Sequence, residues 1–112
     1  MNERLKEPVS QVIALLVAGK YKELETLTHN VRLAADEIAT VVANYGRKLI
    51  PPPNNGFDLM DIVEVKNAKP RRWSISMPLW TQEEGRSDLT VEMTVVEQQD
   101  NFAIELDDVH VL

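Results

Sequence analysis

The hydrophobic positions of the chain repeat at two spacings, and the change between them divides the sequence. Before residue 50, apolar residues recur every three or four positions, as on one face of a helix, whereas after residue 57 they alternate, as in a strand. The segment between, PPPNNG at 51–56, contains three prolines and cannot be helix or central strand. We therefore expect one α+β domain over 1–112, with a helical half at about 1–50, a proline-rich connection at 51–56 and a β half at about 57–112.

The helical half predicts two or three helices. Apolar residues at 9–17 follow Pro8, which suits the first turn of a helix, and Gly19 suits its end. YKELETLTHN at 21–30 predicts a short second helix. A third is predicted within AADEIATVVANYGRKLI at 34–50, with Gly46 as its cap or weak point. Its apolar face consists of Ile38, Val41, Val42, Tyr45 and Leu49.

The β half predicts a four-stranded antiparallel meander, with strands in DIVEVKNA, RRWSISMPLW, DLTVEMTVV and FAIELD. One face of this sheet is apolar, and the other carries serine, threonine and acids, so the helices should pack on the apolar face. The residues expected to be buried are Trp73, Ile75, Met77, Leu89, Val91, Met93, Ile104 and Leu106. Those expected to be more exposed are Ser74, Ser76, Thr90, Glu92 and Glu105.

Two irregularities interrupt the alternation. Pro78 has no N–H to donate, so its strand is an edge there or contains a bulge. Trp80 then falls on the polar face, beside the connection TQEEGRS, in which Gly85 is free to take a positive φ. After Leu106 the alternation slips again, which indicates a second bulge or a tail that leaves the sheet.

Charge is distributed unevenly along the chain. From Gln82 to Leu112 there are nine acidic residues and one arginine, a formal charge of −8, whereas the first 81 residues carry +2. An acidic block disfavours nucleic acid and anionic membranes as partners and favours a basic protein. The alternative interpretation is a solvated sheet face without a partner.

Residues with typical catalytic chemistry are few. The absence of cysteine excludes disulfides, thiolate metal sites and a cysteine nucleophile. It suits a reducing compartment such as the cytoplasm and is also compatible with export. The charged N-terminus does not resemble a signal peptide, and the longest apolar run is too short to span a bilayer. Sequence patterns of phosphate-binding loops, zinc proteases and serine hydrolases are missing. We therefore expect no enzyme activity, no cofactor, no metal site and no membrane or nucleic-acid partner, and the oligomeric state is left open.

The two histidines allow two specific alternatives to the absence of a catalytic or metal site. Paired across the fold, His29 and His110 would be able to act as acid and base, as in a metal-free phosphodiesterase. His110 with Asp107 and Asp108, in DDVH, would be able to bind a metal. Because no third ligand stands at a recognisable spacing, both histidines are interpreted as surface or packing residues.

The polar sheet face allows a pocket or a docking surface. Its hydroxyl groups and acids would form either the floor of a pocket in a cone-shaped fold or a flat docking face. Arg71 and Arg72 are expected to pair with acids on neighbouring strands. The residues of this face are Ser74, Ser76, Thr90, Thr94, Glu92 and Glu105.

Several stretches resemble a known family. EIATVVANYGRKLIPPP, MPLWTQEEGRSDL and ELDDVHVL look like a family of small uncharacterised bacterial proteins over roughly residues 10–112. That resemblance implies no activity and no site. In size, acidity and α+β build, the chain is also similar to the immunity proteins of contact-dependent growth inhibition and related bacterial toxin systems. Such proteins bind a cognate toxin domain, often a basic nuclease, and cover its active site.

Two hypotheses of function follow. The first is an acidic protein-binding module, specifically an immunity-type inhibitor that docks on a basic toxin domain, with Trp80 as an aromatic anchor. The alternative is a small-ligand-binding or enzymatic pocket protein of the cone-shaped, NTF2-like type. The charged residues expected to surround the anchor in the first hypothesis are Glu83, Glu84, Glu92, Glu105, Asp107 and Asp108.

Overall fold

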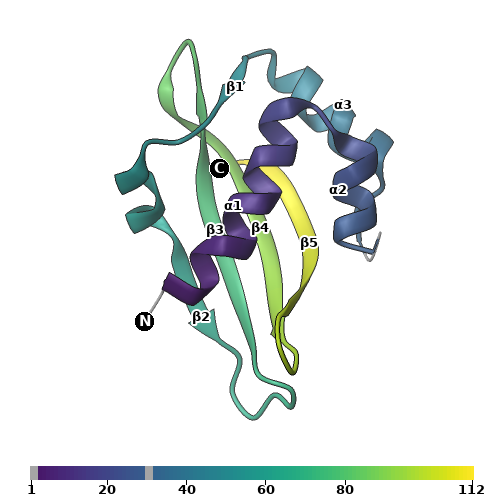
Figure 1. The fold of residues 1–112 in the computed structure, drawn as a ribbon. Coiled ribbons are helices and arrows are strands. Elements are labelled where there is room, and N and C mark those ends of the chain that lie inside the picture. The colour runs from purple at the N-terminus through teal and green to yellow at the C-terminus, as the bar shows by residue number, and fades with distance from the viewer. Residues whose placement is uncertain (1–2, 30–31) are drawn as a thin grey trace.

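The computed structural model describes residues 3–29 and 32–112, and it is an α+β fold as predicted (Figure 1). Helices precede an antiparallel sheet along the chain. None of the described helices is long and apolar enough to cross a membrane. The elements are α1 (Glu3–Ala18), α2 (Tyr21–Leu27), α3 (Ala35–Tyr45), β1 (Leu49–Ile50), the 3-10 helix η1 (Asn54–Leu59), β2 (Asp61–Glu64), β3 (Arg72–Thr81), β4 (Gly85–Glu97) and β5 (Phe102–Val111).

Strands β2 to β5 form the predicted meander, but the described part of the sheet has five strands rather than four. The additional strand β1 lies on the same edge of β3 as β2, opposite Trp80 and Thr81. It was predicted as the end of the third helix. That helix stops earlier because Gly46 adopts a left-handed conformation with φ of 74° and caps it.

Pro78 lies in the gap between β2 and β1 along the edge of β3. β2 pairs with β3 as far as Ser76, and β1 pairs with it from Trp80 onward. Because no described strand pairs with β3 at Pro78 on that side, the missing N–H of Pro78 costs no hydrogen bond there. The register between β3 and β4 also shifts between Pro78 and Trp80, so the predicted bulge is confirmed. On β4, Ser87 donates its hydroxyl hydrogen to the Leu79 carbonyl at 2.7 Å within this irregularity.

The connection after β1 is more regular than expected. The segment 51–56 was predicted to contain no helix, but η1 begins at Asn54, directly after the third proline. Pro53 is extended with ψ of 162°, and its carbonyl accepts a hydrogen bond from Gly56 N at 2.8 Å. The 3-10 helix thus begins directly after the last proline, because the residues from Asn54 onward have backbone N–H groups that are able to donate hydrogen bonds.

Helix α1 starts earlier than predicted and provides the main cover of the sheet. It begins at Glu3, more than one turn before Pro8, which therefore lies inside the helix. The extra turn is held by Leu5, which is buried, and by Lys6, whose Nζ lies 5.0 Å from the centre of the Phe57 ring. Because Pro8 is so close to the helix start, its missing N–H costs one early hydrogen bond.

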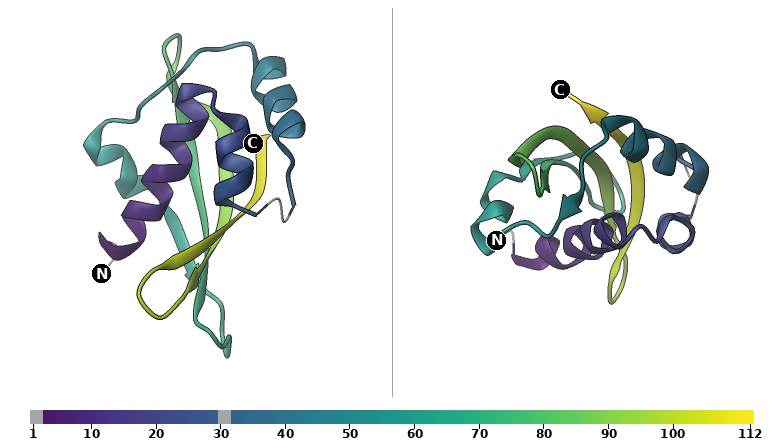
Figure 2. Two further views of the ribbon diagram at one scale, coloured as in Figure 1. Left: turned by 45° about the vertical axis from the view of Figure 1, so that its right-hand side comes forward. Right: turned by 90° about the horizontal axis from the view of Figure 1, so that it is seen from above.

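The core lies between α1 and the sheet. Seen from above, the strands arc around one side of α1 (Figure 2). All eight residues predicted to be buried are at most 5% exposed, and they pack with the α1 residues Val9, Val12, Ile13 and Leu16. Thr90 was predicted to be exposed and this is wrong, since it is 4% exposed. Its cross-strand neighbours Pro78 and His110 flank it on both sides.

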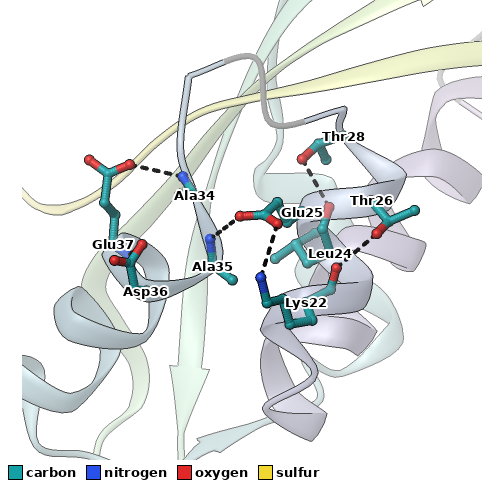
Figure 3. A network of polar contacts seen from close by, with 9 residues as sticks. All are labelled: Lys22, Leu24, Glu25, Thr26, Thr28, Ala34, Ala35, Asp36 and Glu37. Carbon is teal, nitrogen blue, oxygen red and sulfur yellow. Dashed lines mark hydrogen bonds and ion pairs between the residues drawn. The ribbon is translucent and has the colours of Figure 1, made fainter.

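Helices α2 and α3 lie beside the β5 edge of the sheet, so α1 alone of the described helices crosses its apolar face (Figure 1). One hydrogen bond in the polar network of Figure 3 joins the two helices. Ala34, which precedes α3, has no side-chain acceptor, and Glu25 of α2 instead accepts a hydrogen bond from Ala35 N at 2.7 Å. Glu37 accepts from Ala34 N at 2.9 Å. A carboxylate from α2 therefore caps α3 and sets its position beside β5.

Of the two arginines predicted to pair with acids on neighbouring strands, Arg71 does so, whereas Arg72 forms no ion pair among the described side chains. Arg71 Nε and Nη2 donate to the two carboxylate oxygens of Glu64 at 2.9 and 3.1 Å. This hydrogen bonding lowers the pKa of Glu64 and raises that of Arg71. The pair joins the end of β2 to the residue before β3.

Candidate protein-binding surface

The sheet face that points away from α1, here called the outer face, gathers hydroxyl groups and acids. The strand register places them in two rows across β3, β4 and β5. The rows are Ser76, Glu92 and Asp108, and next to it Ser74, Thr94 and Glu105. Four of the seven residues predicted to bind a partner are thereby brought together: Glu92, Glu105, Asp107 and Asp108.

A β-bulge on β5 determines how the two adjacent aspartates are used. Leu106 lies opposite Met93 and Asp108 opposite Glu92, so Asp107 is the extra residue. Its carboxylate accepts hydrogen bonds from Thr94 Oγ1 and from Arg32 Nε, both at 2.7 Å. Asp107 therefore joins the segment before α3 to the sheet. The predicted irregularity after Leu106 is confirmed as a bulge within the sheet.

Glu92 and Asp108 form a like-charged cross-strand pair with a histidine beside it. Their side chains are 43% and 52% exposed. His110 Nε2 lies 3.5 Å from Glu92 Oε2, and His110 Nδ1 lies 3.2 Å from Asp108 Oδ2, although the latter contact lacks hydrogen-bond geometry. Like charges directly opposite each other destabilise a sheet unless a cation lies near them. These carboxylates therefore favour the approach of positive charge.

The metal and acid–base alternatives for the histidines have no matching arrangement. Asp107 of DDVH is turned to Arg32 and Thr94. Within residues 3–29 and 32–112, no three histidine, aspartate or glutamate side chains are placed to hold a metal ion. His29 lines a groove beside α2, whereas His110 lies among the acids of the outer face.

The acidic residues at the tip of the β3–β4 hairpin are used within the protein. Glu84 accepts hydrogen bonds from the Tyr45 hydroxyl at 2.8 Å and from the Thr81 hydroxyl at 3.1 Å. Glu83 accepts from Lys48 N at 3.0 Å. Burial, followed by the hydrogen bond to Glu84, raises the pKa of Tyr45. Both glutamates are exposed, but they hold the end of α3 and the chain before β1 against the hairpin.

Trp80, the predicted anchor, is half-buried against the proline-rich connection. A Cβ added at Gly56 would lie 3.0 Å from its Cη2 atom and 3.1 Å from the Pro52 Cβ, so only glycine fits there without a shift. One side of the indole ring therefore packs within the fold. Its proximity to 51–56 depends on β1 pairing with β3, which the local sequence pattern did not predict.

The space proposed for an NTF2-like pocket, between sheet and helices, is occupied by core side chains, among them Leu16, Met77 and Leu89. A hollow lies instead at the margin of the fold. It is an open groove of about 1560 Å³ between α1, the end of α2 and the β4–β5 hairpin.

The acidic side chains of the outer face differ in whether a basic side chain of the protein already pairs with them. Asp107 is 22% exposed and paired with Arg32. In the described part of the chain, Glu92, Glu105 and Asp108 form no ion pair with lysine or arginine. Three carboxylates thus remain open to an external cation on a sheet that holds them in fixed positions.

Comparison with known proteins places the chain in a family without assigning a function. No curated protein and no solved structure is significantly similar to it. A family model described as a domain of unknown function, DUF7668, matches residues 13–112. The prediction of an uncharacterised family is therefore confirmed, and the chain belongs to the DUF7668 family.

Proposed function

We propose that the protein is an acidic binding module that docks its outer face on a basic protein, as an immunity-type inhibitor docks on a cognate toxin domain. The observation that carries this proposal is the position of Glu92, Glu105 and Asp108 on neighbouring strands without a lysine or arginine partner among the described residues. Lysine and arginine side chains of a partner would supply the missing counter-charges.

The rigidity of this surface supports the proposal. The acids stand on paired strands, and the bulge between them is held by the contacts of Asp107 with Arg32 and Thr94. A surface whose charges are already in position loses little entropy on binding. Ser74 and Ser76, in the same rows, add hydroxyl groups for hydrogen bonds beside the charges.

An inhibitor of a toxin must also bind quickly. The formal charge of −8 from Gln82 onward would attract a basic domain over about a Debye length, roughly 8–10 Å in physiological salt. We place the protein in the cytoplasm, where a toxin that attacks nucleic acid would act.

The test is capture of the partner by matched forms of the protein. The wild type, the double variant Glu92→Lys/Asp108→Lys and the control variant Glu23→Lys are used as baits in a lysate of the native host, and captured proteins are identified by mass spectrometry. Glu23 is exposed on α2, away from the outer face. We expect a basic protein that the wild type and the control retain and the double variant loses.

A binding measurement then separates charge steering from other contacts. The association rate of the identified partner should fall with added salt and should fall most in the double variant, while both variants keep the thermal stability of the wild type. The partner's activity should be blocked in the complex. An acidic partner, or one that both variants retain equally, would contradict the proposal.

A further inference from the structure

The groove at the margin of the fold has the dimensions and lining of a site for a polypeptide segment. Its volume of about 1560 Å³ exceeds the roughly 300–1,000 Å³ of most small-molecule pockets. Pro8 from α1, Leu27 from α2 and Ile104 from β5 give it an apolar floor, and Pro8 and Ile104 are buried.

One wall of the groove is the edge of the sheet. Within the described residues, β5 pairs with β4 and with no other strand. Gln98 N donates to the Asn101 carbonyl at 2.8 Å, and the alternation of an antiparallel ladder then directs the N–H and C=O groups of Phe102 and Ile104 away from β4. None of these groups bonds another described residue. Such an edge is a template for an added strand.

The part of the β5 edge without a described neighbouring strand ends at the bulge, where the segment before α3 contacts Asp107. Arg32, in the segment before α3, donates to Asp107 at 2.7 Å. The chain before α3 therefore meets β5 at the bulge. Among the described residues, the stretch of this edge without a neighbouring strand runs from Phe102 to Leu106, about the length of a short β-strand.

The rim of the groove is acidic. Arg4 is already engaged, since its Nη2 lies 3.3 Å from Glu97 Oε2 and its guanidinium lies 5.2 Å from the centre of the Phe102 ring. Glu7 and Asp100 are exposed and form no ion pair among the described side chains. An extended segment paired with β5 presents alternate side chains to the two faces of the sheet. One set would meet the apolar floor, the other would lie on the side of the outer face, where Glu105 stands, and the acids of the rim would attract its basic residues.

We propose that this groove binds an extended segment of the partner protein, in which lysine or arginine alternates with apolar residues, as an additional strand on β5. The inference rests on the proposed function, because it assigns a second contact of the same basic partner. β5 carries Glu105 and Asp108 on the outer face and Phe102 and Ile104 in the groove, so one partner is able to reach both.

The experiment uses the full chain, labelled with ¹⁵N, and two short synthetic peptides in which valine alternates with lysine or with glutamate. The lysine peptide should shift the amide resonances of Phe102 and Ile104 and slow their hydrogen exchange by about tenfold or more, because these N–H groups become hydrogen-bonded. Slowed exchange distinguishes strand addition from loose electrostatic contact. The glutamate peptide should have no such effect.

Variants locate the charges responsible. Glu7→Lys/Asp100→Lys should weaken binding of the lysine peptide about tenfold or more, whereas Glu92→Lys, on the outer face, should leave its groove contacts unchanged. All three positions lie at the surface, and thermal unfolding checks that the variants fold. Equal effects of the two peptides on Ile104 would overturn the preference for a basic segment. Shifts confined to the outer face, or no binding of the lysine peptide, would overturn the groove as a site, while the bait experiment would judge the outer face separately.

Discussion

Asp107 and Asp108 are adjacent on β5, yet the structure predicts different effects when each is replaced by asparagine. The Asp107 carboxylate accepts hydrogen bonds from both Thr94 and Arg32. An amide has one acceptor oxygen, so Asp107→Asn leaves one of these donors without its partner. The Asp108 side chain is 52% exposed and lies opposite Glu92. Asp108→Asn keeps an oxygen for the Val109 N–H and removes a like-charge contact.

The magnitude follows from these contacts. The bond from Thr94 is partly buried, and losing such a bond costs about 1 kcal/mol. The Arg32 side chain is 57% exposed, so its ion pair contributes about 0.2–1 kcal/mol. We expect Asp107→Asn to lower the free energy of unfolding by about 1–2 kcal/mol, which corresponds to a fall in Tm of about 5–10 °C. Asp108→Asn should change it by no more than about 0.5 kcal/mol.

Urea unfolding followed by tryptophan fluorescence measures both variants, because Trp73 is buried in the core. A double-mutant cycle with Arg32→Ala should show a coupling of about 0.5–1 kcal/mol with Asp107→Asn and none with Asp108→Asn. Equal stability of the two asparagine variants would refute the assignment of Asp107 to the fold and Asp108 to the surface.

Further predictions concern the core, the connection and pH. Leu106→Ala should cost about 2–5 kcal/mol in urea unfolding and Glu105→Ala little, and similar values would contradict the assigned faces. Gly56→Ala should lower the free energy of unfolding by about 1–3 kcal/mol through its clash with Trp80, and Tm should fall with it; an unchanged Tm would show that the ring moves freely. The raised pKa of Tyr45 stabilises the fold below its ordinary value of 10.0, and this contribution is lost as pH rises through the folded value. Stability should therefore fall at alkaline pH more in the wild type than in Tyr45→Phe; parallel curves would exclude this cause.

The periodic parts of the sequence were sufficient to predict much of the fold. Alternation in β3, β4 and β5 identified eight core residues, and both slips in the alternation correspond to bulges. β1 was missed because Leu49 continues the helical spacing of α3, and only its pairing with Thr81, far along the chain, makes it a strand. A local pattern does not contain a contact of that kind, and tertiary pairing overrides it.

The candidate surface could be predicted from the sequence only as a set of acids, because the sequence does not show which of them the fold itself uses. Asp107 accepts a hydrogen bond from Arg32, 75 positions earlier, and Glu84 accepts one from Tyr45, 39 positions earlier. Both partners come from the helical half, and the sequence pattern does not show which residues of that half lie next to which residues of the sheet. Some carboxylates of the acidic block thus join the helices to the sheet, whereas Glu92, Glu105 and Asp108 form no ion pair with lysine or arginine among the described residues. Charge reversal at these three positions therefore tests the proposed binding while leaving the contacts between the helical half and the sheet intact.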